Sequence, residues 1–238
     1  MFKVIPPISN AVDTVQQEAA DLLRLVKPKL RGWLHLGMVP LTLVAVTVMI
    51  VLAPGGAPRI GAIVFGVTGM LLFSTSAIYH RGTWGPRVSA VLKRMDHSNI
   101  FLIIAGSYTP FALTLLNRSQ ATSLLVIVWS GAIAGVIFRV AWVDAPRWLY
   151  TPIYVALGWV AVFYFGPLMR GGGVAIITLI AVGGVLYTIG AVVYGIKRPN
   201  PSPRWFGFHE VFHAFTVLAF AAHYVAASMA IYSTSPSL

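Results

Sequence analysis

The chain has 238 residues, of which 58% are hydrophobic and only 10% are charged. Soluble domains carry about 25% charged residues, so this composition excludes a soluble globular protein and indicates a membrane protein. The formal net charge is +11, but the basic residues lie between apolar stretches rather than in one patch. This distribution favours contact with membrane lipids and argues against nucleic acid as a partner. There is no cysteine, which excludes disulfides, thiolate zinc sites and iron–sulfur clusters.

The first 32 residues are predicted to form a cytoplasmic segment with a short amphipathic helix. Apolar residues recur there at steps of three and four, at Val12, Val15, Ala19, Leu22 and Val26. The first 30 residues are polar and mixed in charge, without the early apolar core of a cleavable signal peptide. We therefore expect a helix on the inner membrane surface. A disordered tail is the alternative.

Seven apolar stretches follow, each close to the roughly 20 residues that cross a bilayer as a helix. They cover residues 33–53, 60–80, 97–116, 122–143, 149–168, 173–195 and 207–232. Basic or Pro/Gly-rich segments such as "APGGAPR", "HRGTWGPRVSAVLKRM" and "MRGGG" separate them. The sequence thus predicts an all-α, polytopic membrane protein. Its seven-transmembrane-helix bundle covers residues 33–232, and a short extracytoplasmic tail covers residues 233–238.

Lysine and arginine indicate the orientation of this bundle. With the N-terminus inside, 14 of the 17 Lys and Arg residues fall on the inner side, and Arg59, Arg118 and Arg170 fall on the outer side. Positively charged residues concentrate in cytoplasmic loops of membrane proteins. We therefore expect a multi-pass protein of the cell membrane with a cytoplasmic N-terminus and an extracytoplasmic C-terminus.

This orientation places polar residues from three spans at one depth, near the inner interface. The second span ends at His80, with Ser76 one turn deeper, and the third span begins at Asp96. The last span begins with His209 and His213, which are four residues apart and therefore project from one helical face. With His80 they would supply three nitrogen ligands for zinc. The alternative is a set of unrelated interfacial residues satisfied by water.

A zinc ion with three protein ligands keeps a fourth position for water and lowers the pKa of that water toward about 7. In such a site Asp96 would hold the water and act as general base. Ser76 would orient the water or stabilise an oxyanion. These two residues are the candidate catalytic groups.

The last span also reads as H-E-x-x-H over residues 209–213, a pattern in which the glutamate is the general base of a zinc protease. Such enzymes draw a further acidic ligand from a later helix, and no acidic residue follows Glu210. We therefore interpret Glu210 as a bystander and the intramembrane protease as the weaker alternative.

Three other histidines are not expected to bind the metal. His223 lies ten residues beyond His213, about 15 Å further along a helix. His97 points about 100° away from Asp96 and is expected to face a neighbouring helix or headgroups. His35 begins the first span and is expected at the membrane interface.

The stretch "SAIYHRGTWGPRVSAVLKRMDHSNIFLIIAGSYTPFAL", residues 76–113, resembles the hemolysin III family, the bacterial branch of the progestin and adipoQ receptor superfamily. The matching pieces are Ser76-x-x-x-His80, Asp96-His97 at the start of a span, "AGSYTP" over residues 105–110, and His209-x-x-x-His213. The resemblance covers essentially the whole membrane part. It implies a seven-helix bundle with zinc near the cytoplasmic side, held by the three histidines already named, with the aspartate holding water and the serine nearby.

The resemblance also implies a range of functions. The receptor branch is linked to ceramidase-type hydrolysis of lipid amides, and the bacterial branch to cytolytic activity and membrane lipid homeostasis. We therefore expect a zinc-dependent hydrolase of lipid amide or ester bonds, of unknown oligomeric state. A non-enzymatic membrane sensor with structural zinc, in which Asp96 is the fourth ligand, is one alternative. A hemolysin-like cytolytic protein is the other.

Overall fold

The computed structural model describes residues 27–234 of the chain. The amphipathic helix expected before residue 27 lies outside the described residues. The described part is entirely helical, as predicted, and contains no β-strand. Its elements are α2 (Trp33–Leu52), α3 (Ala57–Arg81), α4 (Pro86–Leu115), α5 (Arg118–Ala141), α6 (Arg147–Gly158), the 3-10 helix η1 (Trp159–Tyr164), α7 (Phe165–Ile196) and α8 (Phe208–Tyr232).

Six helical stretches are long and apolar enough to cross a membrane, and Arg147–Ile196 is counted as one of them. Large apolar side chains cover the outside of the bundle, including Val51 at 68%, Val174 at 71% and Phe163 at 85% exposure. Soluble proteins rarely expose so much contiguous apolar surface. Length, composition and this surface identify a membrane protein whose outer face meets lipid.

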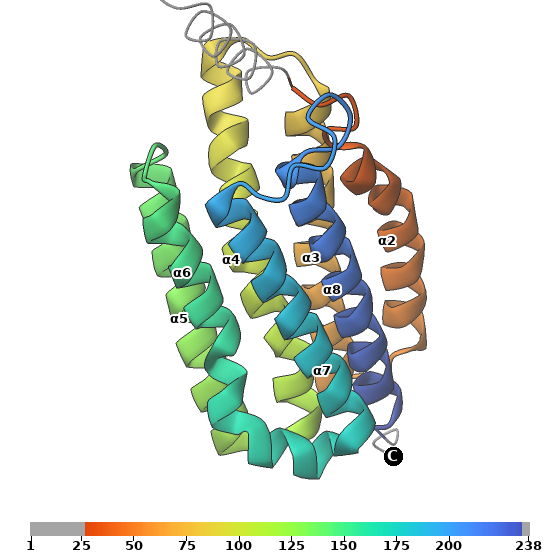
Figure 1. The fold of residues 1–238 in the computed structure, drawn as a ribbon. Helices are drawn as coiled ribbons and strands as arrows, with labels where there is room; N and C mark the ends of the chain where they lie inside the picture. Colours follow the sequence, from red (N-terminus) through yellow and green to blue (C-terminus); the bar gives the residue numbers. More distant parts are fainter. Residues whose placement is uncertain (1–26, 235–238) are drawn as a thin grey trace, which may run out of the picture.

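The long stretch Arg147–Ile196 reverses direction. Figure 1 shows the chain running along the bundle through α6 and returning through α7. The regular helix ends at Gly158, tightens into η1, and is interrupted again at Gly173, whose φ of 71° breaks the helical path. The prediction of one continuous helix over residues 149–168 is therefore wrong. The residues of η1, Trp-Val-Ala-Val-Phe-Tyr, are all apolar, so hydropathy gives no signal of the change.

Helix α4 begins at Pro86, eleven residues before the expected start of the third span. Residues 86–96 include four charged residues, Arg87, Lys93, Arg94 and Asp96, so an apolar window excludes them, although Pro at the first helical position and good helix formers continue the helix. In Figure 1 this part of α4 extends beyond the neighbouring helices. Asp96 consequently lies inside a helix, where the backbone fixes its direction.

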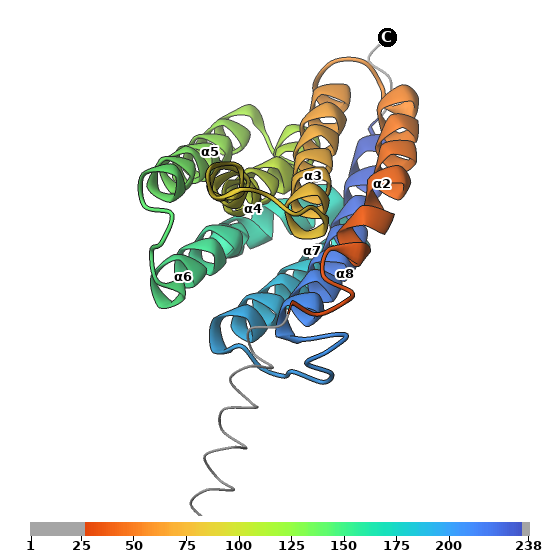
Figure 2. The same ribbon diagram turned by 90° about the horizontal axis from the view of Figure 1, so that it is seen from above.

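Helix α4 lies at the centre of the bundle and packs against α3, α5, α6, α7 and α8, as the view in Figure 2 shows. Small residues allow close approach, as is common between membrane helices. The backbone of Pro110 lies against Gly61, and the side chain of Thr68 lies against Gly106. Phe65 and Phe220 stack with ring centroids 5.0 Å apart, joining α3 to α8. These contacts fix the relative positions of the three helices that carry the candidate site residues.

Candidate metal centre

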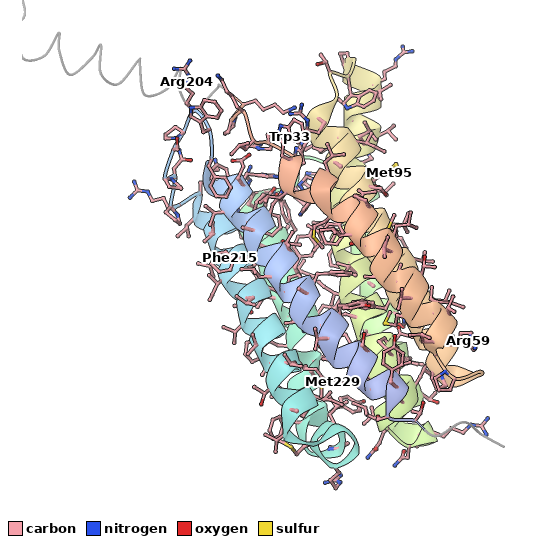
Figure 3. The ribbon with its side chains drawn as sticks, turned by 90° about the vertical axis from the view of Figure 1, so that its right-hand side faces the viewer. Trp33, Arg59, Met95, Arg204, Phe215 and Met229 are labelled. Carbon is pink, nitrogen blue, oxygen red and sulfur yellow. The ribbon has the colours of Figure 1, made fainter. Side chains whose placement is uncertain are left out.

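The residues predicted from three spans meet at one end of the bundle. His80 lies in the last turn of α3, Asp96 lies on α4, and His209 and His213 lie in the first two turns of α8. In Figure 3, Trp33 and Arg204 mark this end of the molecule and Arg59 marks the opposite end. Side chains that are far apart in the sequence therefore share one depth.

The three histidines have the spacing of a metal site. Each offers one ring nitrogen, and these three atoms lie within 4.8 Å of one another. Nε2 of His80 lies 3.2 Å from Nε2 of His209. In a tetrahedral zinc site with Zn–N bonds of about 2.0–2.1 Å, two ligand nitrogens lie about 3.3 Å apart. The three-imidazole donor set and the distance between His80 and His209 therefore suit a tetrahedral metal site.

The position of the two α8 histidines depends on how that helix begins. Glu210, 1% exposed, accepts the backbone N–H of Gly207 at 2.8 Å through Oε2 and pairs with Arg31 through Oε1. Asn200 Oδ1 accepts the backbone N–H of Phe208 at 3.1 Å. Both oxygens of Glu210 are thus used in capping and in an ion pair. This placement agrees with the interpretation of Glu210 as a bystander to the metal chemistry.

Asp96 and Ser76 lie beside the histidines. Oδ2 of Asp96 is 3.5 Å from Nε2 of His80. Ser76 is 1% exposed, and its Oγ has no hydrogen-bond partner among the described residues. A buried hydroxyl without a partner costs about 1–3 kcal/mol, so this Oγ is free to donate to a group bound in the cavity. Both side chains line the same cavity as His209 and His213.

His35 is the residue that the sequence reasoning misplaced. It is 2% exposed, and its ring stacks on His213 with centroids 3.8 Å apart and planes 13° apart. The expectation of an interfacial His35 is therefore wrong. Two contacts draw the start of α2 against α8: the ion pair of Arg31 with Glu210, and the hydrogen bond from Leu30 N to Trp205 O at 3.1 Å. No sequence pattern predicts this contact, because the two helices are separated by more than 150 residues.

The other two histidines lie away from the three-nitrogen cluster. His97 has Nδ1 2.7 Å from Lys93 O and Nε2 3.2 Å from the hydroxyl of Tyr194, so it faces α7, one of the two surroundings expected for it. His223 has Nε2 3.2 Å from Ile180 O, deeper in the bundle. Neither belongs to the group whose nitrogens converge.

The cluster lies between two hollows of different character. An apolar cavity of about 340 Å³ extends into the bundle and includes Leu72, Ile103 and Phe111 in its walls. A polar hollow of about 1140 Å³ opens at the end of the bundle, and His80 lines it. His209 borders both. The candidate site is therefore accessible to apolar groups from one side and to polar groups from the other.

Comparisons with known proteins place the chain in one family. The family model described as "Haemolysin-III related" matches residues 23–224, a range that contains all five candidate site residues. The chain is 35% identical over 159 residues to "Hemolysin-3 homolog" of Bacillus subtilis (strain 168), an alignment covering 67% of this chain and 71% of that protein. It is 36% identical over 134 residues to "Hemolysin-3" of Bacillus cereus, covering 55% of this chain and 59% of that protein.

Proposed function

The chain belongs to the haemolysin-III related family, and on that premise we propose that it is a zinc-dependent membrane hydrolase of lipid amide or ester bonds. The observation that carries the proposal is the convergence of three histidine nitrogens within 4.8 Å, with a carboxylate and a hydroxyl beside them. Three imidazoles are the ligand set of several catalytic zinc sites, which keep one position open. Zinc would be held by His80, His209 and His213.

The chain's own residues then have distinct tasks. When bound, zinc lowers the pKa of a coordinated water toward about 7 and polarises a carbonyl group. Asp96 accepts the proton of the attacking water and returns it to the leaving nitrogen or oxygen, so that water is added across the cleaved bond. Ser76 donates its hydroxyl hydrogen to the oxygen on which negative charge develops. His35 packs on His213 and holds the ring of that ligand in place.

The apolar cavity supports a lipid as substrate. It adjoins His209 and His213 and has a volume of about 340 Å³, within the range of small-ligand sites. An acyl chain in this cavity would place its carbonyl carbon beside the histidines while the chain stays among apolar side chains. A role in membrane lipid homeostasis would follow from such hydrolysis.

The site would lie near the cytoplasmic side of the cell membrane. The end of the bundle that carries the histidines also carries most of the basic residues, whereas Arg59, Arg118 and Arg170 lie at or near the first turns of α3, α5 and α7. We assign two crossings to the reversing stretch Arg147–Ile196, giving seven in all. The transmembrane domain would cover residues 33–232, with residues 1–32 in the cytoplasm and residues 233–238 outside.

A second candidate is a non-enzymatic sensor in which zinc ties the helices together. The distance of 3.5 Å between Asp96 and His80 favours it, because a small movement would make the carboxylate a fourth ligand. Structural zinc sites commonly have four protein ligands. In that case Asp96 would contribute to metal retention rather than to proton transfer.

The test uses purified protein in vesicles of an ether-linked phosphatidylcholine, which has no acyl ester of its own, with either a ceramide or a fatty-acyl ester added. Fatty acid release is followed before chelation, after chelation, and after zinc is restored. We expect release that is lost on chelation and recovered with zinc. Release that continues after the metal has been removed would refute the zinc-dependent mechanism.

A further inference from the structure

The polar hollow at the histidine end is positively charged. Seven lysine and arginine side chains line it, and Asp144 is the only acidic lining residue in the part of the chain that the structure describes. Two of the cations have carboxylate partners: Arg31 pairs with Glu210, and Lys93 pairs with Asp144 at 2.9 Å. The other five pair with no carboxylate within residues 27–234: Lys27, Arg139, Arg147, Lys197 and Arg198. We call these five side chains and the hollow they line the basic vestibule.

Two of these arginines are held in fixed positions. Arg139 is 1% exposed and donates to Trp142 O at 3.2 Å and Val143 O at 2.9 Å. The guanidinium of Arg147 lies 4.4 Å from the ring centre of Tyr194. Carbonyl oxygens and aromatic rings orient an arginine but do not neutralise its charge. The positive charges of Arg139 and Arg147 therefore remain unneutralised by these contacts at the wall of the vestibule.

Lys27, which lines the vestibule, also lies near cations outside the set of five. Burial lowers the pKa of Lys27, and the nearby charges of Arg31 and Arg81 lower it further. Residues 1–26 contain only three acidic residues, fewer than the five cations that have no carboxylate partner within residues 27–234. The vestibule therefore keeps an excess of positive charge whatever the position of that segment. Such a concave, mainly positive surface concentrates anions.

Basic residues at a cytoplasmic membrane face also have a simpler explanation, because they set the orientation of the helices. That explanation requires only that the residues lie on the inner side. It does not require them to line one hollow together with His80 and His209, as they do here. The grouping of these cations in one hollow beside the candidate metal ligands is therefore better explained by the binding of an anion.

The vestibule and the apolar cavity meet at the histidine cluster. His97, Tyr194 and His209 border both spaces. A molecule that fills both must have a charged end and an apolar end. We propose that the site takes an anionic amphiphile, whose phosphate-type headgroup lies in the basic vestibule and whose acyl chain lies in the apolar cavity. This inference rests on the proposed function, because it names the class of lipid to be cleaved at the bond between head and tail.

The experiment measures binding without turnover, in nanodiscs of zwitterionic lipid. Three probes separate the contributions: dodecyl phosphate, uncharged dodecylglycerol with the same chain, and inorganic phosphate, which has no chain. We expect dodecyl phosphate to bind at least about tenfold more tightly than either of the others. Raising the salt from about 50 mM to about 500 mM should weaken the binding of dodecyl phosphate and leave the binding of dodecylglycerol unchanged, since salt screens exposed charges.

A pair of double variants tests the residues. Lys27→Gln/Arg198→Gln removes two exposed vestibule charges that lie outside the helices, and should weaken the binding of dodecyl phosphate about tenfold. Arg118→Gln/Arg170→Gln removes the same charge at the opposite end of the bundle and should leave its affinity unchanged. Equal weakening by both double variants would mean that net charge alone attracts the probe, and would overturn the proposal.

Two other results would also overturn it. If dodecyl phosphate and dodecylglycerol bind equally tightly, the vestibule does not recognise a charged headgroup. If inorganic phosphate binds as tightly as dodecyl phosphate, the apolar cavity does not take up the acyl chain. Because the assay needs no catalysis, it can be repeated with Asp96→Asn. Selective binding of dodecyl phosphate with no hydrolysis of any lipid would refute the proposed function and leave the anionic binding site standing.

Discussion

Nε2 of His80 lies 3.2 Å from Nε2 of His209, although the two residues are 129 positions apart in the sequence. The last turn of α3 and the first turn of α8 bring them together, and α4 places Asp96 3.5 Å from the same atom of His80. A metal ion between the two rings would join the second span to the last one. The contact therefore connects the fold of the bundle with the chemistry proposed for it.

The first prediction concerns the three histidine ligands. Replacing His80, His209 or His213 with alanine should reduce bound zinc from about one ion per chain to near zero, because two remaining ligands hold the ion weakly. Elemental analysis of purified protein measures this directly. His97→Ala is the matched control, since His97 contacts Lys93 and Tyr194 rather than the cluster. Zinc retained at full occupancy by all three variants would contradict the assignment.

The second prediction concerns His35. Its ring stacks on His213, so His35→Ala should lower zinc affinity about 10–100-fold without removing a ligand. His35→Phe keeps a flat ring at the same place and should restore most of that affinity. Zinc titration of the two variants checks this. If the Phe variant binds zinc as weakly as the Ala variant, the nitrogen atoms of His35 matter and a purely packing role is wrong.

The third prediction concerns the ion pair of Arg31 with Glu210. Glu210 is 1% exposed, and Glu210→Gln leaves the partly buried arginine without its charge partner, so it should lower the free energy of unfolding by about 1–3 kcal/mol. The activity of each zinc-loaded molecule should stay close to that of the wild type. Thermal unfolding and fatty acid release measure the two effects. Normal stability combined with lost activity would instead indicate Glu210 as the general base.

The fourth prediction concerns the close packing of α3 and α4. A Cβ added at Gly106 would collide with the side chain of Thr68, so Gly106→Ala should destabilise the bundle by about 1–3 kcal/mol. Gly37→Ala is the control, because nothing lies within 4 Å of a Cβ at that position. Thermal unfolding in one detergent compares the two. Equal unfolding midpoints for the two variants would contradict the close contact between Gly106 and Thr68.

Much of this organisation could be predicted from the sequence because apolar runs and metal-binding residue types are local signals. To predict that His80, Asp96 and His213 lie at the same end of the bundle, only the boundaries and the directions of the spans were needed. The extension of α4 to Pro86 was missed because polar residues can continue a helix beyond the apolar run. The interruption at η1 was missed because its residues are as apolar as the helices around it.

The contact of His35 with His213 could not be predicted from any spacing. It depends on which helices become neighbours in three dimensions, and hydropathy says nothing about that choice. The two hollows also arise only from the packed structure, because their walls combine residues from several helices. Sequence patterns thus indicated the ligands but not the shape of the space around them.

The most direct test compares Asp96→Asn with Asp144→Asn, which removes the same charge from an exposed residue outside the bundle's core. Zinc content and the rate of fatty acid release are measured on the same preparations. With an uncharged ceramide as substrate, the account predicts that Asp96→Asn keeps about one zinc per chain and loses about 10²–10⁴-fold in rate. Asp144→Asn, which changes the charge of the vestibule wall but not the histidine cluster, should behave like the wild type on this substrate. An Asp96→Asn protein that keeps its full rate, or that loses its zinc together with its rate, would contradict the assignment of Asp96 as general base.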